Sequence, residues 1–263
     1  MSEGSAAGLV RAVGRRTNGM IEGLGRLAVF TGSIVAVTAR PPLRVREFAD
    51  ELFKLGVLSI LIITISGLAV GMVLGLQGYN TLVRFGAEGS LGAVVGLSLI
   101  RELGPVLTAL LTTGRAGSAV AAEIGSMKAS EQLNGLRMMA VDPIDYVIKP
   151  KAWAMICVMP LLSALFIVTA IGGGYVVGVG LMGIDGGTYM SSLENAVDFG
   201  NDVAGSILKA LIFGVLVGLI STYRGYSAAP TSAGVSAATT STVVIASVSV
   251  LIFDYFITAL WGV

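Results

Sequence analysis

Two adjacent charged residues, Arg101 and Glu102, interrupt an otherwise apolar stretch of the chain. An ionised side chain near the centre of a membrane helix costs at least ~2.5 kcal/mol, so such residues normally face a cavity or a partner. Neighbouring positions of an α-helix point about 100° apart, so the two side chains cannot satisfy each other. We therefore expect at least one of them to face a polar cavity, a lipid headgroup or another helix. The alternative is a purely structural buried pair.

Two further charges, Lys209 and Asp254, lie in apolar stretches and raise the same question less sharply. Lys209 lies within about two helical turns of the outer end of its stretch. A lysine at that depth could snorkel, which means that its ammonium reaches the membrane surface while its stem stays in the apolar region.

Several kinds of chemistry are excluded by residues that the sequence lacks. There is no histidine, and the one cysteine, Cys157, lies in an apolar run. Ser–His catalysis, an intrachain disulfide and most transition-metal sites are therefore excluded, and we expect no bound cofactor or metal. Without a basic tail, we expect no nucleic-acid partner. No Gly-Lys dipeptide occurs, so the chain has no Walker-type phosphate-binding loop. If the protein is a pump, another subunit hydrolyses the nucleotide, or an ion gradient drives it.

Five apolar stretches are long enough to position these residues in a membrane. Of the 263 residues, 54% are hydrophobic and 13% are charged, against about 25% charged residues in a typical soluble domain. The first stretch has no charged side chain and spans roughly 36 Å as a helix, enough to cross a ~30 Å hydrocarbon core. The sequence predicts an all-α integral membrane protein with transmembrane helices at about Gly56–Tyr79, Leu91–Thr113, Ala152–Leu181, Val203–Tyr223 and Thr242–Trp261.

The distribution of basic residues predicts how these helices are oriented. Fourteen of the seventeen Lys and Arg residues fall before the first stretch, between the second and third, or after the fourth. The loop at 183–202, on the opposite side, contains four acidic residues and no Lys or Arg. By the positive-inside rule, the N-terminus is cytoplasmic and the C-terminus lies outside.

Residues 1–54 differ in character from the five-helix domain at 55–263. Their longest apolar run, Leu27–Val37, is too short to span a membrane. A basic amphipathic segment of this kind is expected to lie in the membrane interface, and Pro41-Pro42 ends it. The alternative is a cytosolic helix packed on a partner. The helical spacing is carried by Val10, Val13, Ile21, Leu24 and Leu27, which alternate with arginines.

Two other segments are candidates for contacts between helices or subunits. Gly67, Gly71 and Gly75 share one face of the first stretch, where another helix of the same chain or of a second copy could approach closely. The segment Ser126–Asp142 is too polar to span and too apolar for a simple linker. We expect it to form a short amphipathic helix for a cytoplasmic partner, ended by Pro143, or alternatively a helix lying flat on lipid.

Five blocks of the sequence resemble the MlaE-type ABC permease family. The likeness covers roughly residues 45–262, in order, and its middle blocks are highly specific, whereas the N-terminal segment matches more loosely. The blocks are GMVLGLQGY (Gly71–Tyr79), LIRELGPVLTALL (Leu99–Leu111), GRAGSAVAAEIGSMKASEQL (Gly114–Leu133), MMAVDPIDYVIKP (Met138–Pro150) and PTSAGVSAATT (Pro230–Thr240).

The resemblance implies a fold, a cargo and a set of partners. Such permeases have an interfacial N-terminal helix, five transmembrane helices and a cytoplasmic coupling helix, and they assemble as homodimers. They lie in the inner membrane of Gram-negative bacteria, with two subunits that hydrolyse ATP, a small STAS-domain protein and a periplasmic MCE-domain ring. Their cargo is phospholipid moved between the inner and outer membranes. The resemblance thus implies a transporter subunit that is not itself an enzyme.

The resemblance also implies which residues carry the function. A lipid pocket at the dimer interface would be lined by Leu74, Gly78, Thr81, Leu82 and Phe85, together with Arg101 and Glu102. The coupling helix, at about 126–142, would centre on Glu131, Gln132, Leu133, Leu136 and Arg137. Asn134-Gly135 departs from the family pattern, in which an acidic residue and Ala are frequent. Gly lowers helix propensity by about 1 kcal/mol relative to Ala, so we expect a looser coupling helix.

Two functions of other classes remain open at this point. An ion-coupled secondary transporter would show inverted repeats and broken helices around its buried charges, and five spans do not divide into equal halves. A non-transporting membrane scaffold would bind cytoplasmic partners without moving a cargo. Dependence of nucleotide hydrolysis on this subunit would separate the scaffold from a transporter.

Overall fold

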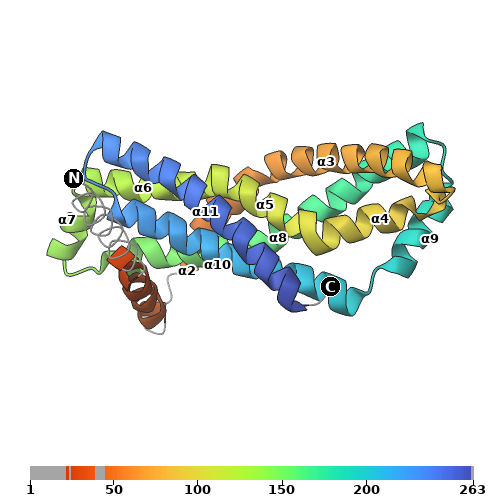
Figure 1. Cartoon of the computed structure of the whole chain (residues 1–263). Helices are drawn as coiled ribbons and strands as arrows, with labels where there is room; N and C mark the ends of the chain where they lie inside the picture. Colours follow the sequence, from red (N-terminus) through yellow and green to blue (C-terminus); the bar gives the residue numbers. More distant parts are fainter. Residues whose placement is uncertain (1–21, 24, 39–44, 262–263) are drawn as a thin grey trace, which may run out of the picture.

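The computed structural model describes residues 22–23, 25–38 and 45–261 of the chain. Within these ranges the protein is almost entirely helical and contains no strand. The helices run side by side in one elongated bundle (Figure 1). Five segments are long and apolar enough to cross a membrane, which confirms the predicted all-α membrane fold: Val45–Phe85, Glu88–Ala129, Ile144–Leu181, Phe199–Ser227 and Ser232–Leu260.

Several spans are assembled from α-helices joined by single turns of π-helix. Two π turns, Leu99–Leu103 and Thr113–Gly117, divide the second span into three α-helices. A π turn inserts an extra residue and is frequent at functional sites. The spans contain α2 (Val45–Leu52) and α3 (Leu58–Leu82); α4 (Leu91–Ser98), α5 (Gly104–Thr112) and α6 (Ser118–Ala129); α8 (Lys149–Tyr175); α10 (Ala204–Ser227); and α11 (Ser232–Trp261).

The fifth span begins ten residues earlier than the sequence predicts, at Ser232 instead of Thr242. The added segment is rich in Ser, Thr and Ala, so hydropathy alone does not mark it as helix. Hydroxyl groups there donate to carbonyls of the preceding turn, for example from Thr239 Oγ1 to the carbonyl of Ser236 at 2.7 Å. This bonding satisfies the side chains within the helix itself.

The glycine face of the first span packs against the third span of the same chain. A Cβ on Gly71 would collide with the backbone carbonyl of Ala170, and a Cβ on Gly75 would lie 3.1 Å from the Cα of Gly174. Gly67 faces Phe166 in the same way. Small residues let α3 and α8 approach closely. Of the two alternatives for this face, the contact within one chain is therefore the one that forms.

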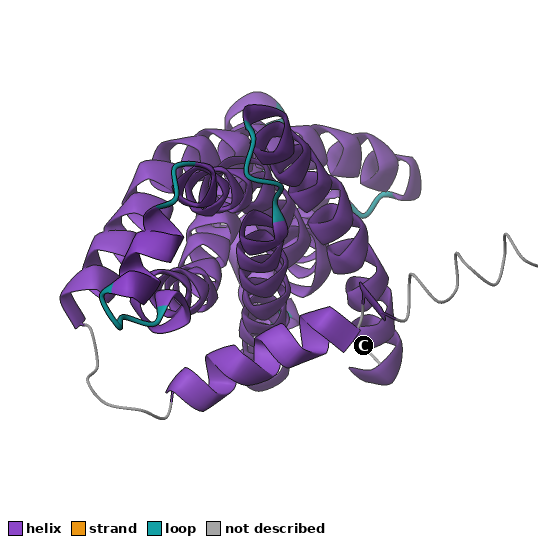
Figure 2. Ribbon diagram, turned by 90° about the vertical axis from the view of Figure 1, so that its left-hand side faces the viewer, coloured by secondary structure: helices purple, strands orange, loops and turns teal. Residues whose placement is uncertain are grey.

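The helix Gly25–Thr38 crosses one end of the bundle, roughly perpendicular to its long axis (Figures 1 and 2). Phe30, Ile34 and Val37 are buried, whereas Val29 and Val35 are exposed. The inner face packs on this chain itself, and Lys149 Nζ donates to the carbonyl of Val37 at 3.1 Å. The predicted positions Val10, Val13, Ile21, Leu24 and Pro41-Pro42 lie outside the described residues.

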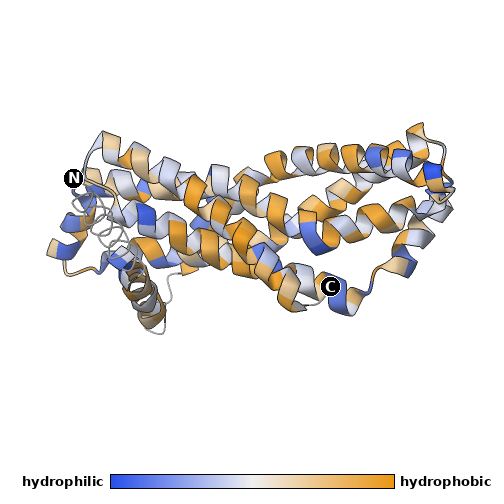
Figure 3. Cartoon of the chain, in the orientation of Figure 1, coloured by the Kyte–Doolittle hydropathy of each residue, from blue (hydrophilic) through white to orange (hydrophobic). Residues whose placement is uncertain are grey.

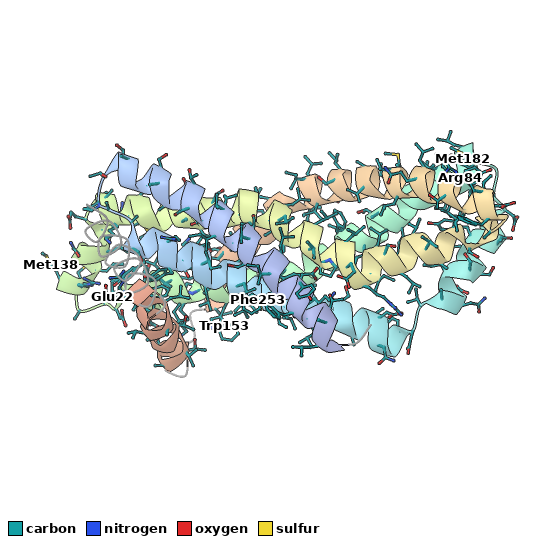
Figure 4. The ribbon with its side chains drawn as sticks, in the orientation of Figure 1. Glu22, Arg84, Met138, Trp153, Met182 and Phe253 are labelled. Atoms are coloured by element: carbon teal, nitrogen blue, oxygen red, sulfur yellow. The ribbon has the colours of Figure 1, made fainter. Side chains whose placement is uncertain are left out.

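Hydrophilic residues gather at the two ends of the bundle (Figure 3). Met138 lies at the end that also carries the helix Gly25–Thr38, and Arg84 and Met182 lie at the opposite end (Figure 4). Two short helices connect spans at these ends, α7 (Gln132–Met138) and α9 (Gly186–Ala196). The predicted grouping of the basic loops on one side of the membrane is therefore compatible with the bundle.

At the end that carries α9, two side chains fix this helix. Asp185 Oδ2 accepts from the backbone N–H of Thr188 at 2.8 Å, and this hydrogen bond lowers the pKa of the Asp185 carboxyl. Asp185 thus caps the N-terminus of α9. The stability that this cap contributes is fully present above the usual carboxyl pKa and is lost as the pH falls through the lowered pKa of Asp185. Tyr189 is buried, and burial raises its pKa to about 12.

Two neighbouring glycines of α8 test how closely α3 and α8 approach. A Cβ on Gly173 would collide with the backbone carbonyl of Leu68, whereas a Cβ on Gly172 would meet no atom within 4 Å. We expect Gly173→Ala to lower the melting temperature of the purified protein. Gly172→Ala, the matched control, should leave it unchanged or raise it, because Ala favours helix by about 1 kcal/mol. Equal melting of the two variants would contradict this packing.

Candidate functional site

Arg101 and Glu102 lie in the π turn Leu99–Leu103, and each pairs with a different element. Arg101 Nε donates to Asp202 Oδ1 at 2.8 Å. Asp202 begins the fourth span, and its side chain is 1% exposed. Its other oxygen, Oδ2, accepts from the backbone N–H of Asp198 at 2.9 Å. The prediction that Arg101 and Glu102 cannot satisfy each other is thus confirmed.

Lys209 of α10 is the centre of the cluster. Its Nζ lies 3.0 Å from Glu102 Oε1 and 3.4 Å from Asp254 Oδ1. The same Nζ donates to the carbonyl of Arg101 and to Thr258 Oγ1, both at 2.8 Å. Thr258 in turn donates to Glu102 at 3.1 Å. Since only 8% of the Lys209 side chain is exposed, Lys209 is paired inside the bundle and does not snorkel.

The residues of the cluster lie at different positions along the three spans that supply them. Arg101 is far from either end of the 42-residue second span. In contrast, Asp202 lies at the start of the fourth span and Thr258 near the end of the fifth. Figure 1 shows that, at the end of the bundle that carries α9, the helices α3, α4 and α9 extend further than α10 and α11. The cluster therefore joins the middle of one span to the outer ends of two others.

The cluster contains little free space. Its cavity has a volume of ≈ 20 Å³ and is lined by Arg101, Glu102, Asn201, Asp202, Gly205, Ser206, Lys209, Ile257 and Thr258. This space suffices for about one water molecule and excludes a phospholipid headgroup. The Arg101 side chain stays 38% exposed, so a headgroup could reach this guanidinium only from outside the cluster. Among the described residues no group of acidic, Cys or His residues could hold a metal.

The structure does not gather all predicted lipid-site residues into one cavity. Leu74 and Leu82 are half-buried and pack against a hydrophobic core that includes Leu91 and Phe166. Gly78 faces Leu91, whereas Thr81 and Phe85 are exposed. The cavity around Arg101 and Glu102 includes none of these first-span residues. Within one described chain, the two parts of the predicted pocket are separate.

The coupling segment is shorter than predicted. Ser126–Ala129 belong to the end of α6, and α7 covers only Gln132–Met138. Glu131 and Ala140 take left-handed backbone conformations, with φ of 61° and 59°, and these bracket α7. A left-handed residue cannot continue a right-handed helix, so the expected single helix over 126–142 is wrong.

The predicted coupling residues divide into an inner and an outer set. Leu133 is buried and Leu136 is half-buried, so both face this chain. Glu131, Gln132 and Arg137 are exposed. Two exposed apolar residues there, Met138 and Met139, are 88% and 67% exposed and were not among the predicted coupling residues. Their position at the end of the amphipathic run was the available signal.

A second charged network lies nearer the end that carries α7. Lys151 Nζ bonds to Glu51 Oε1 at 2.8 Å and to Glu123 Oε2 at 2.6 Å. Arg115 Nη1 donates to the carbonyl of Lys54, in the π turn of the first span, at 2.8 Å. These bonds connect the first three spans. The sequence offered no signal for them beyond the charges themselves, because the partners are distant along the chain.

Comparisons with known proteins agree on one family. A family model described as Permease MlaE matches residues 48–260. The "Intermembrane phospholipid transport system permease protein MlaE" of Haemophilus influenzae is 48% identical over 254 residues, which cover 95% of this chain and 96% of that protein. A "Probable ABC transporter permease protein" of Rickettsia bellii is 37% identical over 96% of this chain and 97% of its own length.

A more distant relative comes from a plant. "Protein TRIGALACTOSYLDIACYLGLYCEROL 1, chloroplastic" of Arabidopsis thaliana is 30% identical over 231 residues. The match covers 88% of this chain and 66% of that protein.

The cluster predicts unequal effects of its members on stability. Lys209→Met should lower the free energy of unfolding by ~3 kcal/mol, because Glu102 and Asp254 then lose their shared cation. Glu102→Gln should lower the free energy of unfolding less, because Lys209 still forms its ion pair with Asp254. Thermal melting of the purified protein in detergent measures both. If the two variants melt alike, Lys209 is not the centre of the cluster.

Proposed function

Because the chain belongs to the MlaE permease family, we propose that it is the membrane subunit of an ABC transporter that moves phospholipid between two membranes. The observation that carries the proposal is the 48% identity, over almost the full length of both chains, to a permease named for intermembrane phospholipid transport. Other relatives are named as ABC transporter permeases, which supports nucleotide hydrolysis on a partner subunit.

The physical chemistry of the cargo sets what the chain has to provide. Each CH₂ group that leaves an apolar environment costs ~0.8 kcal/mol. Two acyl chains of roughly fifteen carbons therefore represent about 25 kcal/mol, too much for a polar channel. A carrier has to keep the chains in an apolar groove and give the headgroup a polar contact. The apolar outer half of α3 and the exposed part of Arg101 support this division of roles.

The proposed lipid groove lies between two copies of the chain. Its residues are Leu74, Gly78, Thr81, Leu82 and Phe85 of each copy, with the exposed edge of Arg101 for the phosphate. Glu102 is reserved for the ion pair with Lys209. The first and fifth spans are the least buried of the five. Only 22% and 11% of the residues in their most apolar stretches are buried within the chain, which supports their availability to a second copy.

The proposed partner at the opposite end is the ATPase subunit. We assign α7 and its neighbours Met138 and Met139 to this contact, because exposed methionines suit a deformable apolar interface. The end that carries α7 is then cytoplasmic and the C-terminus periplasmic. A STAS-domain protein and a periplasmic MCE-domain ring complete the proposed assembly in the inner membrane of a Gram-negative cell, on the strength of family membership.

Reconstitution with the ATPase subunit tests the proposed function. Donor vesicles that contain the complex and a fluorescent phospholipid should transfer the lipid to acceptor membranes only when ATP is supplied. Leu82→Trp should fill the groove and suppress transfer at least tenfold while the complex stays assembled. Normal ATP hydrolysis without any lipid transfer by the unmodified complex would refute the proposed cargo.

The methionines beside α7 predict where the ATPase binds. Met138→Glu should weaken binding of the ATPase subunit about tenfold or more, because a charge would be buried in an apolar contact. Met190→Glu is the matched control, since Met190 is an exposed methionine on α9 at the far end of the bundle. Co-purification of the ATPase with each variant measures the effect. Equal recovery would remove Met138 from the interface.

A further inference from the structure

One tyrosine at the end of α10 contacts three other elements. The hydroxyl of Tyr226 accepts from Arg137 Nη2 of α7 at 2.6 Å. Its backbone carbonyl accepts from Lys128 Nζ of α6 at 2.8 Å, and the same Nζ lies 5.9 Å from the centre of its ring. The ring also lies 5.5 Å from that of Phe30, in the helix Gly25–Thr38. Tyr226 therefore connects α10 to the whole end of the bundle that carries α7.

The other end of the same helix reaches the charged cluster. Lys209 and Tyr226 are 17 residues apart in one α-helix, which corresponds to about 26 Å. α10 contains no proline and no π turn from Ala204 to Ser227, whereas the second span contains two π turns. An uninterrupted helix moves as a rigid body, so a displacement at Tyr226 reaches Lys209 undiminished.

Three glycines bring the backbone of α10 close to α8 and α6. A Cβ on Gly214 would lie 3.0 Å from the Cα of Ile156, and one on Gly218 would lie 3.1 Å from the carbonyl oxygen of Ala152. A Cβ on Gly225 would lie 3.1 Å from the Cα of Ala121. At these three points α10 presents backbone to α8 and α6, while its side chains Phe213 and Val217 are fully buried in the shared core. Shifts of about 1–2 Å between packed helices are common in switching proteins.

The cluster offers alternative positions for the moving charge. Lys209 Nζ lies between Glu102 and Asp254, at 3.0 and 3.4 Å. Glu102 belongs to the second span and Asp254 to the fifth. A small axial shift of α10 would change which carboxylate is nearer, while the ammonium stays paired throughout. The cluster can thus change its arrangement without an uncompensated buried charge.

We propose that Tyr226 is a positioning residue that ties α7 to α10, so that a displacement of α7 by the nucleotide-hydrolysing partner moves Lys209 relative to Glu102 and Asp254. The inference rests on the proposed function, because it requires a partner that displaces α7. The hydrogen bond from Arg137 to the Tyr226 hydroxyl transmits the movement. The ring and carbonyl of Tyr226 only hold the side chain in place.

The test removes one hydroxyl from the full complex. Tyr226→Phe keeps the ring contacts with Phe30 and Lys128 but loses the bond from Arg137. It should lower the number of lipids transferred per ATP hydrolysed by about three- to tenfold, the range for an ordinary intramolecular hydrogen bond. Tyr223→Phe is the matched control, one turn earlier, where the hydroxyl forms no hydrogen bond among the described residues and the ring also faces Phe30. It should stay within about twofold of the unmodified protein.

A second measurement does not depend on the cargo. Spin labels at the exposed positions Val94 of α4 and Ile207 of α10, in a Cys157→Ala background, report the distance between the second and fourth spans. Trapping with nucleotide should shift this distance by about 1–2 Å in the unmodified complex but not in Tyr226→Phe.

The outcomes separate the inference from the proposed function. A normal lipid yield per ATP and a normal shift in Tyr226→Phe would overturn the role of Tyr226 and leave the proposed function intact. Absence of lipid transfer by the unmodified complex, with a shift that Tyr226→Phe abolishes, would refute the cargo and support the inference. If Tyr226→Phe loses transfer only in proportion to lost ATPase binding, Tyr226 serves assembly alone and the inference is wrong.

Discussion

The ammonium of Lys209 is the contact on which the arrangement of three spans depends. A buried ion carries a desolvation penalty of several kcal/mol, which only good geometry and further hydrogen bonds offset. Lys209 meets this condition with partners from the second and fifth spans, Glu102, Asp254 and Thr258. The fourth span therefore cannot rotate about its axis or leave the bundle without exposing unpaired charges. This constraint also pairs Glu102 within the chain, and the side chains of Glu102 and Arg101 are each 38% exposed.

Close glycine packing holds the remaining spans and determines which surfaces stay free. The glycine face of α3 is used by α8, so the first span presents its larger apolar residues outward. Ile65, Leu68 and Val73 are exposed there, and Leu251 and Phe253 are exposed on α11. In a membrane these faces meet acyl chains or a second subunit. Internal packing by glycine and external apolar surface are thus two consequences of one sequence pattern.

The sequence predicted the five spans because hydropathy is a local property that adds up over a helix length. It could not predict the partner of Arg101, because Asp202 is 101 residues away and lies in what reads as an acidic loop. The role of Thr258 carried no signal at all. The division of the coupling segment was missed because nothing in the residue types of Glu131 and Ala140 indicates a left-handed backbone. The exposure of Met138 likewise follows from that backbone and not from composition.

The claim that the charges of Lys209, Glu102 and Asp254 compensate one another within one chain can be tested by removing all three. The measurement is the free energy of unfolding of the triple variant Lys209→Met, Glu102→Gln, Asp254→Asn, compared with Lys209→Met alone. Neutral groups of similar shape leave no buried charge without a partner, so the triple variant should regain most of the stability that the single variant loses. A triple variant that is as unstable as Lys209→Met, or less stable, would contradict the account.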